Sequence, residues 1–163
     1  MQLDATIPAP GPGRPPVPTP RLIDPRGHRF GAGLSVVILA TAWLIDAPIL
    51  VVGIFLALGV SAWFGTRYSI LGKPWPTVRR LLRLGPPREL ESEFPPRFAQ
   101  ALGALALGLA TVAFLVGLPT VGWLLTGAVA ALQSLLALTG YCLGCRLYFL
   151  RWYAPALFAR LAR

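Results

Sequence analysis

The hydrophobic pattern of the chain consists of long apolar runs separated by short polar breaks. The four runs are residues 30–45, 48–64, 98–118 and 121–142. A single helix through residues 30–64 would be about 50 Å long, which exceeds the ~30 Å hydrocarbon core of a bilayer. We therefore divide it at Asp46, the expected N-cap of the next helix, with Pro48 in the first turn. The pattern predicts two helical hairpins.

The segments outside the apolar runs divide the rest of the chain. Residues 1–20 are dominated by Pro and Gly and are predicted to form a disordered tail. Residues 65–97 form a long polar loop, and residues 151–163 form a basic amphipathic tail. We predict an all-α membrane protein in residues 21–150, with four transmembrane helices as two hairpins plus short interfacial amphipathic helices. A cleaved signal peptide is the competing interpretation of the first run.

The polar loop contains a candidate surface helix. Residues 77–84 place leucines mainly on one side and arginines on the other, which is typical of a helix that lies on anionic lipid headgroups. A solvated basic loop is the alternative. The predicted membrane-surface residues in the loop and in the C-terminal tail are Trp75, Arg79, Arg80, Arg83, Trp152 and Tyr153.

Composition supports a membrane environment, and charge orients the chain. Apolar residues make up 55% of the sequence and charged residues 13%, against about 45–50% and about 25% in soluble domains. The net charge is +9, yet all 15 Lys and Arg residues lie in the two tails and the long loop, and none lies in the two tight turns. The positive-inside rule then predicts a multi-pass protein of the inner (plasma) membrane with both termini in the cytoplasm, and no nucleic-acid partner.

The predicted spans are uncharged. They contain no Asp, Glu, Lys, Arg or His, which argues against a proton pump or ion-coupled transporter, although a permease for a neutral molecule is still compatible. His28 is the only histidine, so haem held by two histidines of one chain is excluded, and we expect no cofactor.

Small and polar residues within the runs predict helix contacts. Gln133 is expected to make an interhelical hydrogen bond. Small residues spaced four apart predict close packing, within the chain or in a homo-oligomer; they are Ala99/Gly103, Ala104/Gly108 and Gly140/Gly144.

The candidate chemistry lies in the sequence GYCLGCRLY, Gly140–Tyr148. Cys142 and Cys145 are the only cysteines, and residues three apart share a face of a helix. The pair has three interpretations: a redox dithiol, an inert pair at a helix end, or half of a metal site. A structural zinc ion needs four Cys/His ligands, and His28 is distant in sequence, so zinc would need a dimer or partner. We predict no metal in a single chain.

The reactivity of a dithiol depends on what stabilises its thiolate. Arg146 is adjacent to the pair, and a helix that began at the cysteines would lower a thiol pKa further. A helix that ran unbroken through Gly140 would remove that help, and the sequence is compatible with both. Because the predicted compartment is reducing, no permanent structural disulfide is expected. The predicted thiol-tuning residues are Asp24, Arg26, His28, Arg29 and Arg146.

Several motifs carry a family resemblance. They are IDPRGHRFGAGL, GTRYSILGKPWP, PPRELESEFPPRFAQALG and ALTGYCLGCRLYFL, spread over residues 22–150. On these motifs the chain resembles the bacterial integral-membrane family of domain of unknown function 4395. The resemblance implies a small multi-span protein with a terminal C-x-x-C, and it favours thiol chemistry beside thioredoxin-like or sulfurtransferase proteins.

The leading hypothesis is thus a membrane protein whose Cys142 and Cys145 exchange disulfide or persulfide sulfur with a cytoplasmic thioredoxin-like or rhodanese-like partner. The competing hypothesis is a non-enzymatic scaffold or assembly subunit with inert cysteines.

Overall fold

The computed structural model describes residues 21–87 and 89–149, and these are mostly helical. The predicted N-terminal tail, the predicted C-terminal tail, Trp152 and Tyr153 lie outside the described residues. The elements in chain order are β1 (Leu22–Ile23), α1 (Pro25–Leu44), α2 (Pro48–Phe64), η1 (Thr66–Tyr68), α3 (Trp75–Leu81), β2 (Glu91–Ser92), α4 (Phe94–Leu115), α5 (Pro119–Thr139) and an unlabelled C-terminal helix of residues 143–149.

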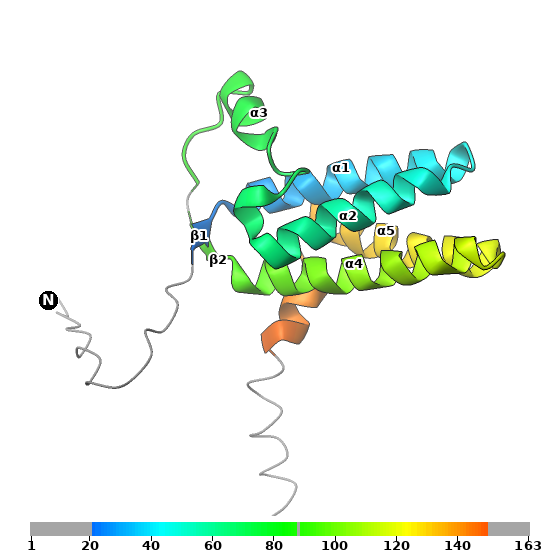
Figure 1. The fold of residues 1–163 in the computed structure, drawn as a ribbon. Helices are drawn as coiled ribbons and strands as arrows, with labels where there is room; N and C mark the ends of the chain where they lie inside the picture. The colour runs from blue at the N-terminus through cyan, green and yellow to red at the C-terminus, as the bar shows by residue number, and fades with distance from the viewer. Residues whose placement is uncertain (1–20, 88, 150–163) are drawn as a thin grey trace, which may run out of the picture.

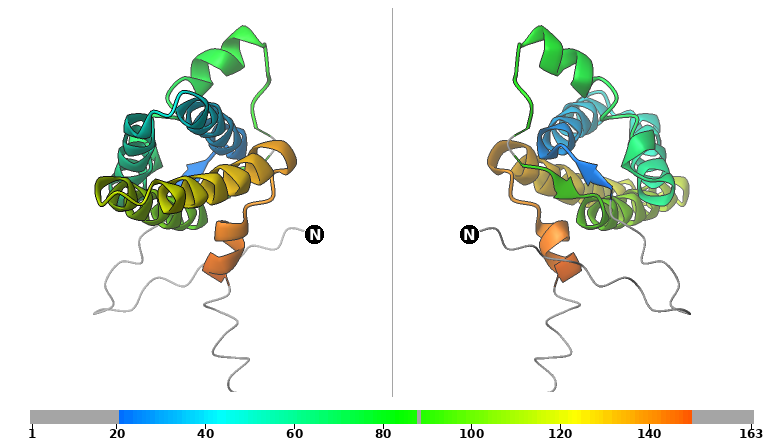
Figure 2. Two further views of the ribbon diagram at one scale, coloured as in Figure 1. Left: turned by 90° about the vertical axis from the view of Figure 1, so that its right-hand side faces the viewer. Right: turned by 90° about the vertical axis from the view of Figure 1, so that its left-hand side faces the viewer.

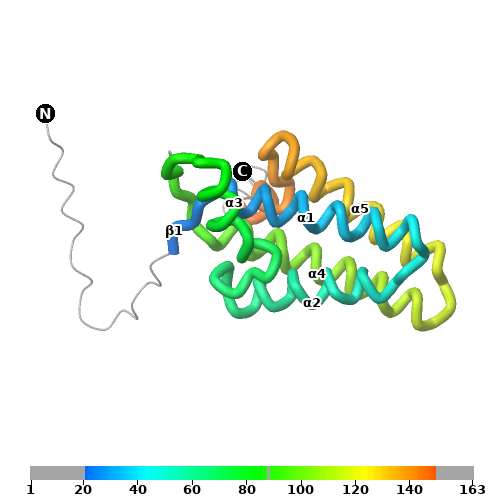
Figure 3. Tube along the Cα trace, turned by 90° about the horizontal axis from the view of Figure 1, so that it is seen from above, coloured from blue at the N-terminus to red at the C-terminus, as the bar shows by residue number. Residues whose placement is uncertain are grey.

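The four long helices form a bundle of two hairpins, α1–α2 and α4–α5 (Figure 1). Seen from above, α1 lies along α5 and α2 lies along α4, and these pairs hold the two hairpins together (Figure 3). Both tight turns lie at one end of the bundle. The strands, α3 and the C-terminal helix gather at the other end (Figure 1).

Two of the described helices, α4 and α5, are long and apolar enough to cross a membrane, judged by length and composition. Helix α2 is apolar but shorter, with 17 residues. Helix α1 begins earlier than predicted, at Pro25, so its first turns carry Arg26, His28 and Arg29. The predicted bundle of apolar helices is therefore present, and two of its four helices meet the criterion for a span.

The prediction that Asp46 caps the second helix is wrong. The N-cap of α2 is Ala47, which makes no side-chain capping bond. Asp46 adopts a left-handed conformation with φ 49° and ends α1 instead: its N–H donates to Trp43 O, and that of Ala47 donates to Ala42 O at 2.8 Å. This bond pattern is a Schellman motif, in which a left-handed residue satisfies the last carbonyls of a helix.

The second turn repeats this solution with Gly117, whose φ is 78°. The Gly117 N–H donates to Phe114 O, and the Leu118 N–H donates to Ala113 O at 2.8 Å. A proline follows each motif at the first position of the next helix, where its missing N–H costs nothing. In each hairpin the turn is thus formed by backbone hydrogen bonds within the turn itself.

Polar side chains link the helices inside the bundle. The Gln133 amide nitrogen donates to Ser35 Oγ at 3.3 Å, which confirms the predicted interhelical bond between α5 and α1. A second bond, from Ser61 Oγ to Gln100 Oε1 at 2.6 Å, joins α2 to α4. The small residues of α4 serve contacts within the chain, because Gly108 and Gly103 lie against the Phe55 ring and Leu58 of α2.

The polar end of the bundle is closed by contacts to the start of α1. Asp24 caps this helix by accepting the Arg26 N–H at 2.9 Å. Its other oxygen accepts the Trp75 indole N–H at 3.1 Å and lies 3.7 Å from the Arg79 guanidinium, so Asp24 also holds α3 against the bundle. The segment predicted as a helix over residues 77–84 forms α3, Trp75–Leu81, which ends before Arg83, whose φ is 51°.

A short antiparallel pair, β1 and β2, corrects the purely α-helical prediction. It joins Leu22 to Ser92 and Ile23 to Glu91, and so places the residues before α1 beside those before α4. Strands of two residues are too short to produce a period-two pattern in the sequence.

Candidate functional site

The helix breaks at Gly140, which settles the alternative left open by the sequence. Helix α5 ends at Thr139, and Gly140 is left-handed with φ 76° while its N–H donates to Leu136 O at 2.9 Å. The chain then turns, and residues 143–149 form a new helix that points away from α5 (Figure 2). The cysteines therefore lie at the beginning of a helix, and the fourth predicted span ends at Thr139 instead of residue 142.

Cys142 and Cys145 are joined by a disulfide, with their Cα atoms 5.2 Å apart. The Cys145 N–H donates to Cys142 Sγ at 3.1 Å, and the Arg146 N–H donates to the Cys142 carbonyl at 3.1 Å. Cys142 thus takes the place of an N-cap residue, with sulfur as the capping acceptor. When the disulfide is reduced, the same N–H is positioned to stabilise a thiolate on Cys142.

Gly144, between the cysteines, sets their distance from the bundle. A Cβ atom added there would lie 2.7 Å from the Ala99 Cβ of α4, closer than real side-chain contacts allow. One turn further on, the Tyr148 ring packs 5.8 Å from the Phe98 ring of the same helix. The glycine therefore lets the C-terminal helix lie directly on α4.

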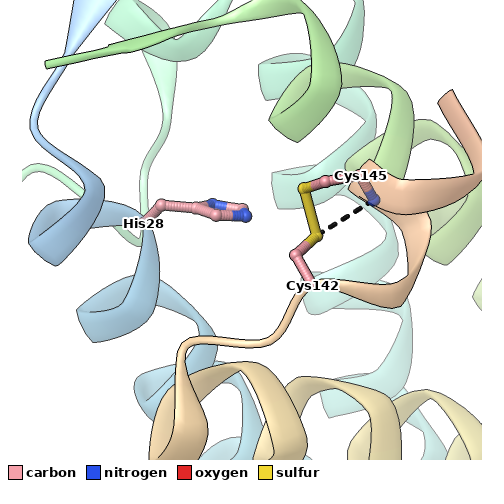
Figure 4. Close-up of side chains that lie close together, drawn as sticks. All are labelled: His28, Cys142 and Cys145. Atoms are coloured by element: carbon pink, nitrogen blue, oxygen red, sulfur yellow. Dashed lines mark hydrogen bonds between the residues drawn. A yellow bond between two sulfur atoms is a disulfide. The ribbon is translucent and has the colours of Figure 1, made fainter. Parts of the chain in front are cut away.

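His28 is a predicted tuning residue that the structure brings to the cysteine sulfurs. The sequence treats it as distant, but α1 carries it to the cysteines, and the ligand atoms of His28, Cys142 and Cys145 all lie within 4.8 Å of one another (Figure 4). Its Nε2 atom is buried and has no hydrogen-bond partner within the described part of the chain. Burial lowers the pKa of His28 from 6.5 to about 4, because desolvation disfavours the imidazolium, so the ring is neutral at pH 7.

The other predicted tuning residues lie at different places. Arg146 is exposed, with its guanidinium 5.5 Å from the centre of the Tyr141 ring. Arg29 donates to the carbonyls of Ala137 and Leu138, at 3.2 and 3.0 Å, and so offsets the negative end of α5.

Asp24 and Arg26 make their contacts elsewhere. The Asp24 carboxylate bonds Trp75, and Arg26 donates to Gly85 O at 3.4 Å. The structure thus brings His28 to the sulfur atoms, places Arg29 and Arg146 on the surrounding rim, and engages Asp24 and Arg26 with α3 and the loop after it.

Two hollows meet at the cysteines. A mostly apolar cavity of about 150 Å³ lies among α1, α4, α5 and the C-terminal helix, and His28, Gln100, Gln133 and Cys142 contribute its polar atoms and sulfur. A more polar hollow of about 410 Å³ reaches both cysteines from the rim. Gln100 is not among the predicted site residues, although an amide inside an apolar run was an available signal.

The comparisons with known proteins agree with the family resemblance. A family model described as "Domain of unknown function (DUF4395)" matches residues 23–152. The chain belongs to this family. No curated protein and no solved structure matches it. The matched region of this DUF4395 protein includes both cysteines and His28, and because the family description states no activity, the chemistry has to be argued from the geometry of these residues.

We expect Gly144→Ala to weaken the packing of the C-terminal helix. The added methyl group meets Ala99, and overpacking of this kind costs about 1–3 kcal/mol of unfolding free energy. Gly127→Ala is the matched control, since no atom lies within 4 Å of the added Cβ and alanine favours the helix. Unfolding in detergent and the rate of cysteine alkylation after reduction measure both variants. Equal behaviour of the two would contradict the packing role.

The lowered pKa of His28 predicts how the free energy of unfolding of the disulfide form depends on pH. Its pKa is about 4 when folded and 6.5 when unfolded, so only the unfolded chain gains a proton between these values. The free energy of unfolding should therefore be unaffected by His28 above pH 6.5 and should fall towards pH 4, by up to about 3 kcal/mol. The difference between the wild type and His28→Gln, measured by chemical unfolding across this range, isolates the effect from the titration of carboxylates.

Proposed function

We propose that this chain is an integral membrane protein that exchanges disulfides with a cytoplasmic dithiol protein of the thioredoxin-like type. The observation that carries the proposal is the position of Cys142 Sγ, which accepts the Cys145 N–H at the start of a helix and lies beside a histidine whose Nε2 atom is buried. An inert pair at a helix C-terminus would have neither feature.

The exchange is balanced as follows. A thiolate of the partner attacks one sulfur of the Cys142–Cys145 disulfide, so that one S–S bond breaks and a mixed disulfide forms. The second partner thiol resolves the mixed disulfide, which leaves the partner oxidised and the chain as a dithiol. Two electrons and two protons have moved to this chain, and the reverse sequence returns them.

The surroundings assign roles to the two cysteines. Cys142 is the sulfur whose thiolate is stabilised by a backbone N–H, so it is the leaving group in one direction and the nucleophile in the other. Burial disfavours the imidazolium form of His28, so the neutral ring accepts a hydrogen bond from a thiol of the reduced pair, and the thiol proton leaves to solvent through the polar hollow. The polar hollow that reaches both cysteines provides access for the partner.

Exposed apolar surface supports insertion into a bilayer. Only 22% of the apolar window of α4, and the same share of α5, is buried inside the bundle. Large side chains on both helices face outward, among them Leu105 at 62% exposure and Leu124 at 69%. The core helix of a soluble protein would be mostly buried, whereas lipid explains an apolar surface on all sides.

The arrangement of charge supports four spans and the cytoplasmic orientation. The starts of α1 and α4, helix α3 and the C-terminal helix share one end of the bundle, and these carry the arginines (Figure 1). The two tight turns at the far end contain no Lys or Arg. With that far end outside, the positive-inside rule is satisfied and the cysteines face the cytoplasm.

The proposed exchange predicts that Cys142 and Cys145 react at different rates. In each single variant, the remaining cysteine is first activated with an aromatic disulfide and then mixed with reduced thioredoxin whose resolving thiol is blocked. We expect Cys145→Ser to accumulate the mixed disulfide with thioredoxin, because Cys142 keeps its stabilised thiolate. Cys142→Ser should react at least about tenfold more slowly, since the remaining thiol lacks that N–H. Non-reducing gels and maleimide gel shifts of the purified full-length chain measure both rates.

The wild type provides the equilibrium control. It should pass reversibly between dithiol and disulfide in glutathione buffers as a two-electron couple. Cysteines that stay reduced throughout, or that react equally in the two single variants, would favour the scaffold hypothesis.

Topology is tested with single cysteines in a Cys142→Ser/Cys145→Ser background. Thr120→Cys lies at the start of α5, at the turn end of the bundle, and Glu89→Cys lies in the loop before β2; both native residues are exposed. In intact cells, a membrane-impermeant maleimide should label only Thr120→Cys. External labelling of Glu89→Cys would reverse the orientation, and release of the protein by alkaline carbonate would exclude insertion.

A further inference from the structure

The cluster at the end of the bundle has the donor set of a metal centre. It consists of two cysteine sulfurs and one histidine nitrogen, all within 4.8 Å of one another. Cys₂His is a ligand set that zinc accepts in proteins, with C-x-x-C as a recurrent spacing of two of the ligands. The disulfide form cannot use this set, because zinc binds thiolates. The dithiol form can.

The imidazole of His28 gives an independent reason to place a ligand here. Its Nε2 is buried without a hydrogen-bond partner in the described residues, and a buried polar atom destabilises the fold unless something binds it. The ring points at the cysteines (Figure 4). A metal ion between the ring and the two sulfurs would use the nitrogen lone pair that the protein leaves unpaired.

The distances require little movement. Ligands of a tetrahedral zinc ion, at about 2.0–2.3 Å from the metal, lie about 3.5–3.8 Å from one another. The present cluster, with all its ligand atoms within 4.8 Å, already has this scale. After reduction the two sulfurs have to separate, which rotation about the cysteine side-chain bonds can provide while one helical turn keeps the Cα atoms 5.2 Å apart.

The charges also balance. Two thiolates and one Zn²⁺ sum to zero beside a neutral imidazole, which suits a site that is partly buried. The nearby cations are occupied elsewhere: Arg29 donates to the carbonyls at the end of α5, and Arg146 lies over the Tyr141 ring. Both arginine residues are exposed, so solvent screens their repulsion of the ion.

We propose that the dithiol form of this chain binds one zinc ion through Cys142, Cys145 and His28, with the fourth position open to the hollows beside the cysteines. Binding releases the two thiol protons to solvent and involves no electron transfer. The site does not depend on the proposed disulfide exchange, because any reductant produces the dithiol. Metal and disulfide exclude each other, so the oxidation state of the pair decides whether zinc is held.

The test uses the full-length chain, purified in detergent through a tag without histidine and kept reduced under argon. The chain has one histidine and two cysteines, so no other residues of these types compete. Titration with Co²⁺ should give thiolate-to-metal charge-transfer bands and the visible bands of tetrahedral cobalt, and Zn²⁺ should displace the cobalt at one ion per chain. The oxidised protein should show none of these bands.

Three variants separate the ligands. Cys142→Ser/Cys145→Ser should lose the charge-transfer bands. His28→Ala should bind the metal ion at least about tenfold more weakly. Loss of a residue that only hydrogen-bonds to a metal ligand already weakens binding by this much, and loss of a ligand itself should cost no less. His28→Cys supplies a third thiolate, so it should restore affinity and strengthen the charge-transfer bands, which a purely structural role of His28 would not produce.

Three results would overturn the proposal. They are an absence of binding by the reduced wild type, one ion per two chains, and equal affinity of the wild type and His28→Ala. Because disulfide exchange is measured on separate cysteine variants without metal, failure of the zinc site leaves that result unaffected.

Discussion

The contact between Gly144 and Ala99 positions the two cysteines of the candidate site. It allows the C-terminal helix to rest on α4 with no side chain between them, so the cysteines on either side of Gly144 are held against the bundle. The left-handed turn at Gly140 makes this contact accessible by ending α5 just before it. Without both glycines, the sulfurs would not be held beside His28.

Burial then gives the site its chemical character. The first turns of α1 pack the half-buried His28 beside the cysteines, and desolvation of its ring keeps the ring neutral at pH 7. A neutral imidazole accepts a hydrogen bond from a thiol and is a ligand for a metal ion. The same geometry therefore supports disulfide exchange in one oxidation state of the cysteines and zinc binding in the other.

The polar end and the apolar body of the bundle have separate roles. Asp24 both caps α1 and anchors α3 through Trp75, so the start of the helix that carries His28 is fixed at two points. The outward faces of α4 and α5 expose many large apolar side chains, whereas the polar groups and the cysteines lie at the end of the bundle. In the proposed orientation, the site at that end would meet a cytoplasmic protein while the body of the bundle lies in lipid.

The sequence by itself determined the helices, the hairpins and the position of the charges. These depend on local features: continuous apolar runs, prolines that start helices, and arginines excluded from the turns. It also identified Cys142 and Cys145 as the candidate chemistry and Gln133 as an interhelical donor, because polar groups in apolar runs need partners.

Only the tertiary structure decided how the ends of the helices are used. Asp46 ends α1, because its left-handed conformation lets the N–H groups of Asp46 and Ala47 bond the last carbonyls of that helix. A search for N-caps does not detect such a helix end. The position of the cysteines after the break at Gly140 depended on the contact of Gly144 with a helix 45 residues earlier, at Ala99. The approach of His28 to the cysteines depended on the packing of α1 on α5, which no local pattern encodes. Spacing along the chain reports neighbours within one helix, whereas a site shared by three helices is set by how those helices pack.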